Sequence, residues 1–162
     1  MSQSSLVMYE AELKAIQQAI GRLAVEARAR AVFVVNKDGQ LIASAGNTAD
    51  IDSTSLAALI AGNAAATGSL ARILGEQREF SVTYNEGARE NLYGIIAGGR
   101  VILVVIFDSQ TSSLGLVRLR VKKTKEELEV IIERVVAKGA ANATLPSPLA
   151  EITDDDIENL FR

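Results

Sequence analysis

The chain has 162 residues, of which 48% are hydrophobic, 23% are charged and 4% are aromatic, and its formal net charge is −3. That length is enough for one domain with a buried core plus a tail. The small negative charge favours neither nucleic acid nor an anionic membrane as a partner. The chain holds no Cys and no His, which excludes disulfides and zinc–thiolate sites and removes the commonest general base and metal ligand. The composition therefore favours a non-catalytic protein with no cofactor and no metal.

The N-terminus has no basic start followed by a long apolar run, so a secretory signal is not predicted. No apolar segment approaches the ~18 residues of a membrane span. We therefore expect a cytoplasmic protein without a membrane span.

The first part of the chain predicts a helix followed by a hairpin. Apolar residues at helical spacing place the helix at about Tyr9–Ala29. Two short strands follow at Ala31–Asn36 and Leu41–Ala45, and the turn between them has Asp38 and Gly39 at its centre.

A longer helix is predicted at Ser53–Glu76, with Asp52 or Ser53 as its N-terminal cap and Gly75 at its end. Its expected core face is a stripe at three- and four-residue steps, formed by Leu56, Ile60, Asn63, Thr67, Leu70 and Leu74.

A second stripe of this helix carries almost no side-chain bulk, which lets another backbone approach closely. Its members are Ala58, Ala61, Ala65, Gly68 or Ser69, and Arg72. Two interpretations stay open: tight packing against the protein's own sheet or a second copy, and a docking face for another protein. A phosphate-binding loop is not predicted here, because the glycine spacing differs and no Lys precedes the hydroxyl residue.

Three strands are predicted next, at Phe80–Tyr84, Asn91–Ala97 and Val101–Phe107. The last is apolar on both faces, so helices are expected on both faces of the sheet. The economical packing is an α/β fold, namely a three-layer α/β/α sandwich. Its central sheet has five antiparallel strands, with one helix on one face and two on the other, and a flexible C-terminal tail follows.

One of these strands is expected at a sheet edge, because it follows a long crossover. Its alternating apolar residues are Phe80, Val82 and Tyr84. An uncovered edge invites pairing with the same edge of a second copy, which predicts a homodimer with one continuous sheet and its two central helices side by side.

The last long helix is predicted from about Ser113 to Lys138, ending at Gly139, because its apolar residues hold helical phase over about seven turns. Three basic residues share one of its faces: Arg118, Lys122 and Lys125. That face is either a solvated surface or a groove for an acidic partner.

Residues 139–151 have the composition of a linker, and residues 152–162 predict a short acidic amphipathic helix or peptide. A helix this short is marginal alone in water, so it is expected to fold onto a partner or back onto its own domain. The residues expected to bind are Asp154, Asp155, Asp156, Ile157, Leu160 and Phe161. A metal site at the three aspartates is not predicted, because no further ligand converges on them.

Four stretches carry a resemblance to a known family: AVFVVNKDGQLIASAG, DSTSLAALIAGNAAATGSLARILGE, ENLYGIIAGGRVILVVIFD and SSLGLVRLR. Over about Leu6–Lys138 the sequence resembles the roadblock (dynein light chain) family. It is most similar to the bacterial MglB-type GTPase-activating members, which regulate the small Ras-like polarity GTPase MglA. The segments AGNAAATGSLA and EITDDDIENLF look specific to the MglB group.

The resemblance implies a roadblock domain at residues 6–138 that forms a homodimer and seats one Ras-like small GTPase of the MglA type on two copies. It implies that GTP hydrolysis is stimulated by positioning the GTPase's own catalytic Arg and Gln. The tail would modulate nucleotide affinity or exchange, in cell polarity or motility control at a cell pole. Arg72 would then be either a rim charge or a transition-state finger.

Two other functions stay open. One is a roadblock scaffold that binds a GTPase or motor component without activating hydrolysis. The other is an unrelated small-molecule sensor or enzyme on a similar sandwich, which requires a pocket rich in polar groups. The sequence also does not show which residues of the small-residue stripe form the dimer seam and which bind the GTPase.

Overall fold

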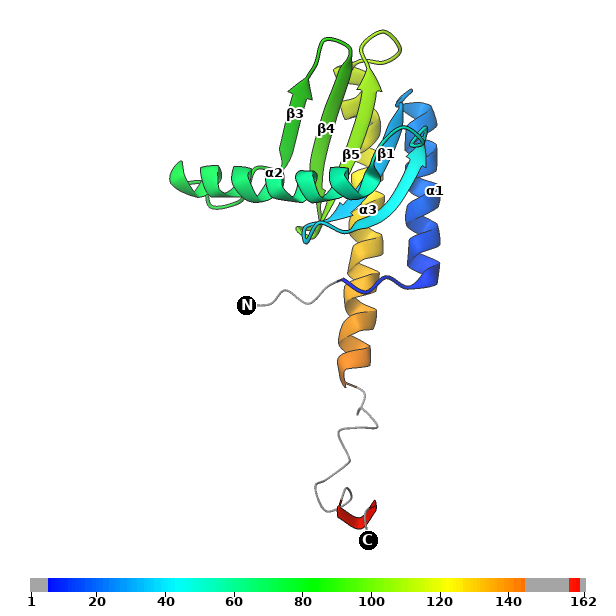
Figure 1. The fold of residues 1–162 in the computed structure, drawn as a ribbon, viewed down its shortest axis with the longest axis vertical. Helices are drawn as coiled ribbons and strands as arrows, with labels where there is room; N and C mark the ends of the chain where they lie inside the picture. The colour runs from blue at the N-terminus through cyan, green and yellow to red at the C-terminus, as the bar shows by residue number, and fades with distance from the viewer. Residues whose placement is uncertain (1–5, 145–157, 161–162) are drawn as a thin grey trace.

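The structure is a computed structural model that describes residues 6–144 and 158–160. Its helices are α1 (Glu10–Glu26), α2 (Ser53–Ile73) and α3 (Leu114–Thr144). Its strands are β1 (Ala31–Asn36), β2 (Leu41–Gly46), β3 (Val82–Glu86), β4 (Glu90–Ala97) and β5 (Val101–Asp108). Figure 1 shows their arrangement.

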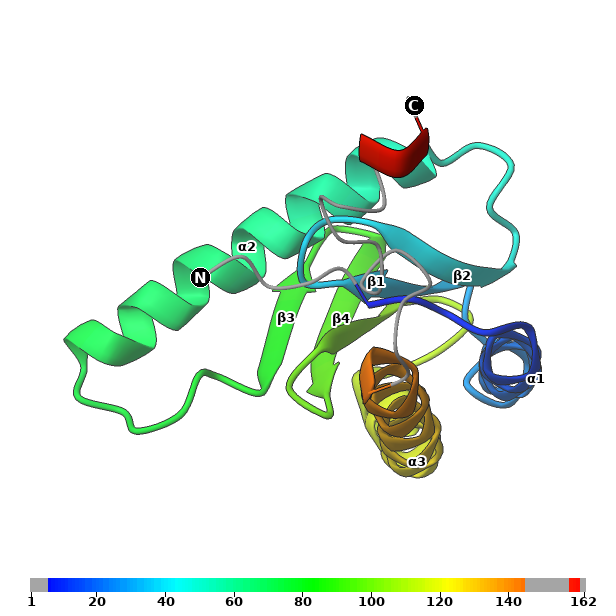
Figure 2. The same cartoon turned by 90° about the horizontal axis from the view of Figure 1, so that it is seen from below.

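The five strands form one sheet in the order β2-β1-β5-β4-β3, and all neighbours are antiparallel. Helices α1 and α3 cover one face and α2 covers the other (Figure 2). The predicted three-layer architecture, with two helices on one face and one on the other, is therefore confirmed.

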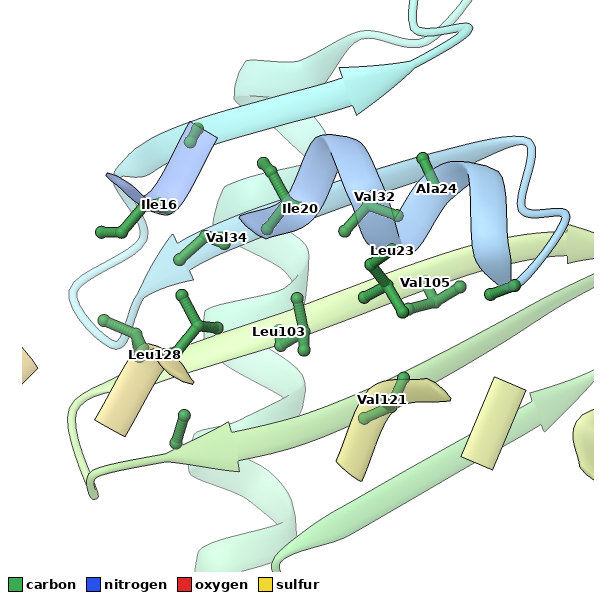
Figure 3. Packing of buried hydrophobic residues seen from close by; sticks show 14 of the residues in the cluster. Ile16, Ile20, Leu23, Ala24, Val32, Val34, Leu103, Val105, Val121 and Leu128 are labelled. Carbon is green, nitrogen blue, oxygen red and sulfur yellow. The ribbon is translucent and has the colours of Figure 1, made fainter. Parts of the chain in front are cut away.

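The larger part of the core lies between the sheet and the α1–α3 layer. Figure 3 shows Leu23 of α1, Leu103 of β5 and Leu128 of α3 pointing into it. On the opposite face, a smaller cluster joins Phe33 of β1 to Ile60 of α2. Strands β1 and β5 are buried on both faces because they lie between these two clusters.

Capping interactions at both ends of α2 explain where the helix begins and ends. The Oδ1 atom of Asp52 accepts a hydrogen bond of 3.1 Å from the main-chain N–H of Ser55, so Asp52 is the cap. Gly75 has a φ of +80°, and the N–H groups of Gly75 and Glu76 bond back to the carbonyls of Arg72 and Ala71. A left-handed glycine of this kind ends a helix. Both predicted end signals are confirmed.

Several predicted boundaries are wrong. α1 ends at Glu26 rather than at about Ala29, and α2 ends at Ile73 rather than at Glu76. β3 begins at Val82, because its register with β4 would place Phe80 opposite Ala97, where β4 gives way to the hairpin turn. The last helix does not end at Gly139 but continues to Thr144. Side chains from the start of the chain hold this extension, as described below.

The expectation that no segment approaches a membrane span also needs correction. α2 contains an 18-residue window of mean hydropathy 1.3, so by length and composition alone it could cross a membrane. In this structure α2 lies on the sheet and 28% of that window is buried. The apolar residues of α2 therefore form two groups: one faces the sheet and the other faces solvent.

Candidate partner-binding surfaces

The face of α2 that contacts the sheet is built mostly from small residues. Ala57 and Ile60 are buried in the cluster between α2 and the sheet, and Leu56 and Ala64 pack partly against it. Ala71, near the end of the helix, is also buried. The predicted core stripe is confirmed at Ile60, and Leu56 and Thr67 are half-buried. It is wrong at three positions, because Asn63, Leu70 and Leu74 are exposed.

The reason is that α2 crosses the strands and its C-terminal end projects beyond β3, where no sheet lies under it (Figure 1). Four large apolar side chains of this helix are in solvent: Leu59 (72% exposed), Leu70 (53%), Ile73 (80%) and Leu74 (71%). We call these four residues the leucine flank. Leu70, Ile73 and Leu74 lie within about one turn of one another, and exposed apolar side chains gathered in this way are candidates for an interaction surface.

The predicted small-residue stripe is also on the surface. Its exposed members are Ala58, Ala65, Ser69 and Arg72, and Ala61 and Gly68 are half-buried. At 3.6 residues per turn, Ala65 and Leu70 point about 140° apart around the helix, whereas Ile73 lies about 40° from Ser69. α2 therefore presents a low-bulk surface and a leucine-rich surface that meet at Ser69 and Ile73.

The small-residue stripe starts beside the turn between β1 and β2. A Cβ atom added to Gly39 would lie 3.6 Å from the Cα of Ala58 and 3.8 Å from the Cβ of Ala61. At the other end of the stripe, the Nη2 atom of Arg72 donates a hydrogen bond of 2.9 Å to the Oγ of Ser69. Arg72 is thus held along its own helix.

A hollow of about 380 Å³ lies at the opposite end of β1 from that turn. Its apolar lining includes Ile51, Leu92 and Ile106, and its rim carries Arg30 and Glu90. The two rim residues form an ion pair of 3.0 Å. This part of the sheet, on the side of α2, is left uncovered.

The outer edge of β3 is open to pairing. Ile96 donates its N–H to the carbonyl of Ser81, and the register continues with Thr83 opposite Gly94. Because antiparallel pairs alternate, Val82 and Tyr84 direct their N–H and C=O groups away from β4. Among the described strands none pairs with this edge. β3 is thus the edge strand that the sequence predicted.

The side chain of Tyr84 points inward from this edge. Its ring stacks on Phe107 with centroids 6.4 Å apart, and its hydroxyl donates a hydrogen bond of 3.3 Å to Asn91. Val82 packs against the same α1–α3 core, while Phe80 precedes the strand. Val82 and Tyr84 therefore offer their main chains, rather than their side chains, to a partner strand.

A polar cluster fixes the turn from β5 into α3. Asp108 accepts hydrogen bonds from the N–H of Gln110 (2.8 Å) and from Nε of Arg89 (2.5 Å). These contacts, the first above all, hold the pKa of Asp108 below its ordinary value. Ser113 then caps α3, because its Oγ accepts the N–H of Leu116. This cluster has a structural role.

The basic face predicted on α3 is only partly paired. Lys125 pairs with Glu129 at 3.1 Å, while Arg118 and Lys122 are exposed.

The structure also bears on the acidic residues and the tail. Within residues 6–144 and 158–160, no three Asp or Glu side chains are grouped to hold a metal ion. Leu160 is 80% exposed. The remaining predicted tail residues lie outside the described part of the chain: Asp154, Asp155, Asp156, Ile157 and Phe161.

Comparison with known proteins defines the class. The model of the Roadblock/LC7 domain matches residues 15–107, so the chain belongs to the Roadblock/LC7 family. A search of the curated proteins finds no match.

Solved structures place the chain within that family. MglB of Myxococcus xanthus is 55% identical over 80% of this chain and 96% of its own, with a TM-score of 0.75. The gliding protein MglB of Thermus thermophilus is 35% identical over 80% of this chain and 97% of its own, with a TM-score of 0.74. A structure described as MglB with a tetrameric arrangement is 34% identical over 81% of this chain and 97% of its own, with a TM-score of 0.75. This chain is thus MglB-like.

Two surfaces were missed at the level of sequence: the leucine flank and the hollow. The flank carried a signal, because α2 has more large apolar residues than one buried stripe requires. The hollow carried none, since it depends on where α2 crosses the sheet.

Proposed function

We propose that this protein is a homodimeric regulator of a Ras-like small GTPase of the MglA type. In this role it stimulates GTP hydrolysis by positioning the GTPase's own catalytic residues. The observation that carries the proposal is 55% identity to Myxococcus xanthus MglB over 80% of this chain, whose α2 leaves both small and large apolar side chains exposed.

The dimer of this proposal pairs the β3 edges of two copies. A two-fold axis between these edges would bring the partner's α2 over the opposite ends of the strands, where the hollow lies. That arrangement covers apolar groups that are otherwise in solvent. The leucine flank, with Leu70 more than half exposed, then belongs to the dimer seam.

The small-residue stripe is left for the GTPase. Ala58, Ala65 and Ser69 carry little bulk, so a partner backbone can approach α2 closely. Two copies of α2, one from each chain, form the platform for one GTPase. Arg72 serves at the rim, because its hydrogen bond to Ser69 directs it along the helix. A chain without His suits a protein that positions another protein's chemistry.

The tail completes the proposal. Its acidic residues and its apolar edge, which includes Leu160, bind the GTPase away from the platform and modulate nucleotide affinity or exchange. The protein acts in the cytoplasm in control of polarity or motility, enriched at a cell pole.

The test is single-turnover GTP hydrolysis by the organism's MglA-like GTPase, with and without this protein. The test variant changes both Ala65 and Ser69 to Arg, which places two bulky charges on the small-residue stripe. The matched control changes Gln18 and Val25 to Arg, because both are exposed on α1, on the other side of the sheet. We expect acceleration that the test variant loses and the control keeps. Binding without acceleration would demote the protein to a scaffold.

A further inference from the structure

The last turns of α3 extend past the ends of the strands, so the sheet does not support them (Figure 1). Between Val135, which is buried, and Asn142, every residue of the helix is exposed. The helix then continues through Gly139, a residue that costs about 1 kcal/mol in a helix relative to Ala. A Cβ atom at Gly139 would meet nothing within 4 Å. An extension of this kind frays unless tertiary contacts hold it.

Four side chains supply those contacts, and we call them the clasp: Tyr9, Glu12, Lys138 and Asn142. Lys138 and Asn142 are four residues apart and so share one face of α3. The Nζ atom of Lys138 lies 2.5 Å from Oε1 of Glu12 and 5.4 Å from the centre of the Tyr9 ring. The Nδ2 atom of Asn142 donates a hydrogen bond of 2.8 Å to the Tyr9 hydroxyl.

Glu12 is the buried member of the clasp. It is only 5% exposed although it carries a charge, and its Oε2 atom has no hydrogen-bond partner within the described structure. The cations that face it are Lys138 and Arg134, both from α3. A buried carboxylate needs such a partner, so the position of Lys138 is specified by Glu12 rather than by the sheet.

We propose that the clasp positions the C-terminal tail, by holding the last turns of α3 as a rigid lever whose end sets where the tail begins. α3 ends at Thr144, two residues beyond Asn142. Residues 145–157 separate that point from the helical residues 158–160. The anchor of a tether sets the effective concentration of what it carries, so a frayed anchor would weaken tail binding. This use of the lever depends on the proposed function, whereas the clasp itself can be tested without any GTPase.

The first test is amide hydrogen exchange of the full chain, resolved over residues 137–144. Lys138→Met removes the charge but leaves Glu12 buried without its partner, so a gentler variant, Asn142→Leu, removes only the hydrogen bond to Tyr9. We expect exchange in this segment to be about tenfold faster in both variants, while β1 and β5 keep their protection. Unchanged exchange in both variants would overturn the proposal.

The second test compares the clasp variants with a chain that stops after Thr144, using the affinity of the GTPase for nucleotide as the readout. We expect Asn142→Leu to weaken the tail's effect in the direction of the truncation and to leave the acceleration of hydrolysis unchanged. If the truncation acts and neither clasp variant does, the positioning role is overturned. If the truncation itself has no effect, the tail's role in the proposed function fails, whereas faster exchange in the variants still supports the lever.

Discussion

The side-chain amide of Gln17 donates a hydrogen bond of 2.7 Å to the main-chain carbonyl of Ser44. Gln17 belongs to α1 and Ser44 to β2, so a helix reaches over one outer strand of the sheet. Within residues 6–144 and 158–160, no side chain or strand is bonded to the outward main-chain groups of Val82 and Tyr84 on the other outer strand, β3. The two edges are therefore unequal, and the proposed dimer uses β3 for that reason.

A proline at Val82 should separate dimerisation from folding. The N–H of Val82 points away from β4, so Val82→Pro removes a group that only a partner strand would use. We expect monomers by sedimentation, with the circular dichroism spectrum of the parent. Thr83→Pro is the matched control: it removes an N–H paired with Gly94 and should destabilise the domain itself. A Val82→Pro chain that remains dimeric would show that β3 is not the seam.

The two surfaces of α2 should respond differently to substitution. Leu70→Glu places a charge in the proposed seam, and because burying a leucine contributes about 1.5–3 kcal/mol, self-association should weaken by at least about tenfold. Ala65→Arg should leave the dimer intact and reduce binding of the GTPase. Sedimentation and a binding titration measure the two effects. If Ala65→Arg dissociates the dimer, the assignment of the two surfaces is reversed.

Acid should destabilise the domain through carboxylates whose pKa the fold lowers. Ser55 lowers the pKa of Asp52, and the N–H of Gln110 lowers that of Asp108, both from an ordinary value of 3.8. Below that value the unfolded chain binds more protons than the folded one. Their contribution is therefore complete above about pH 4 and is lost as the pH falls further.

Denaturant unfolding at fixed chain concentration, from about pH 7 to about pH 3, measures this loss. Asp52→Asn keeps a side-chain cap but cannot titrate. We expect its stability at neutral pH to stay close to that of the parent and its loss of stability in acid to be smaller. An unchanged acid profile would mean that Asp52 has the same pKa in both states.

The α1–α3 core should be sensitive to cavities. Leu128 is fully buried on α3, so Leu128→Ala should lower the free energy of unfolding by about 2–5 kcal/mol. Val130, two residues along the same helix, is about half exposed, and Val130→Ala should cost far less. Equal losses for the two variants would contradict the packing of α3.

The sequence predicts α3 well because its apolar residues, such as Val121 and Leu128, are large and keep one helical phase. It predicts the face of α2 less well, because helical spacing alone does not distinguish leucines that face a sheet from leucines that face a partner. Helical spacing places Leu70 and Leu74 in the core for that reason, whereas in the structure Ala57 packs against the sheet and Ala71 is buried.

The end of α3 depends on residues far away in the chain. Gly139 is a local stop signal, but Tyr9 and Glu12 outweigh it through contacts more than 120 positions distant in sequence. The small-residue stripe was found from sequence because low bulk is itself a pattern. The proposed division between this stripe and the dimer seam rests on where α2 crosses the sheet, which the sequence does not predict.

The proposed role as a GTPase activator is tested by the rate of GTP hydrolysis by the MglA-like GTPase, in a single turnover, as the concentration of this protein is raised. We expect acceleration that saturates near two chains per GTPase and that Ala65→Arg with Ser69→Arg abolishes. No acceleration at any ratio, with the GTPase bound, would contradict it.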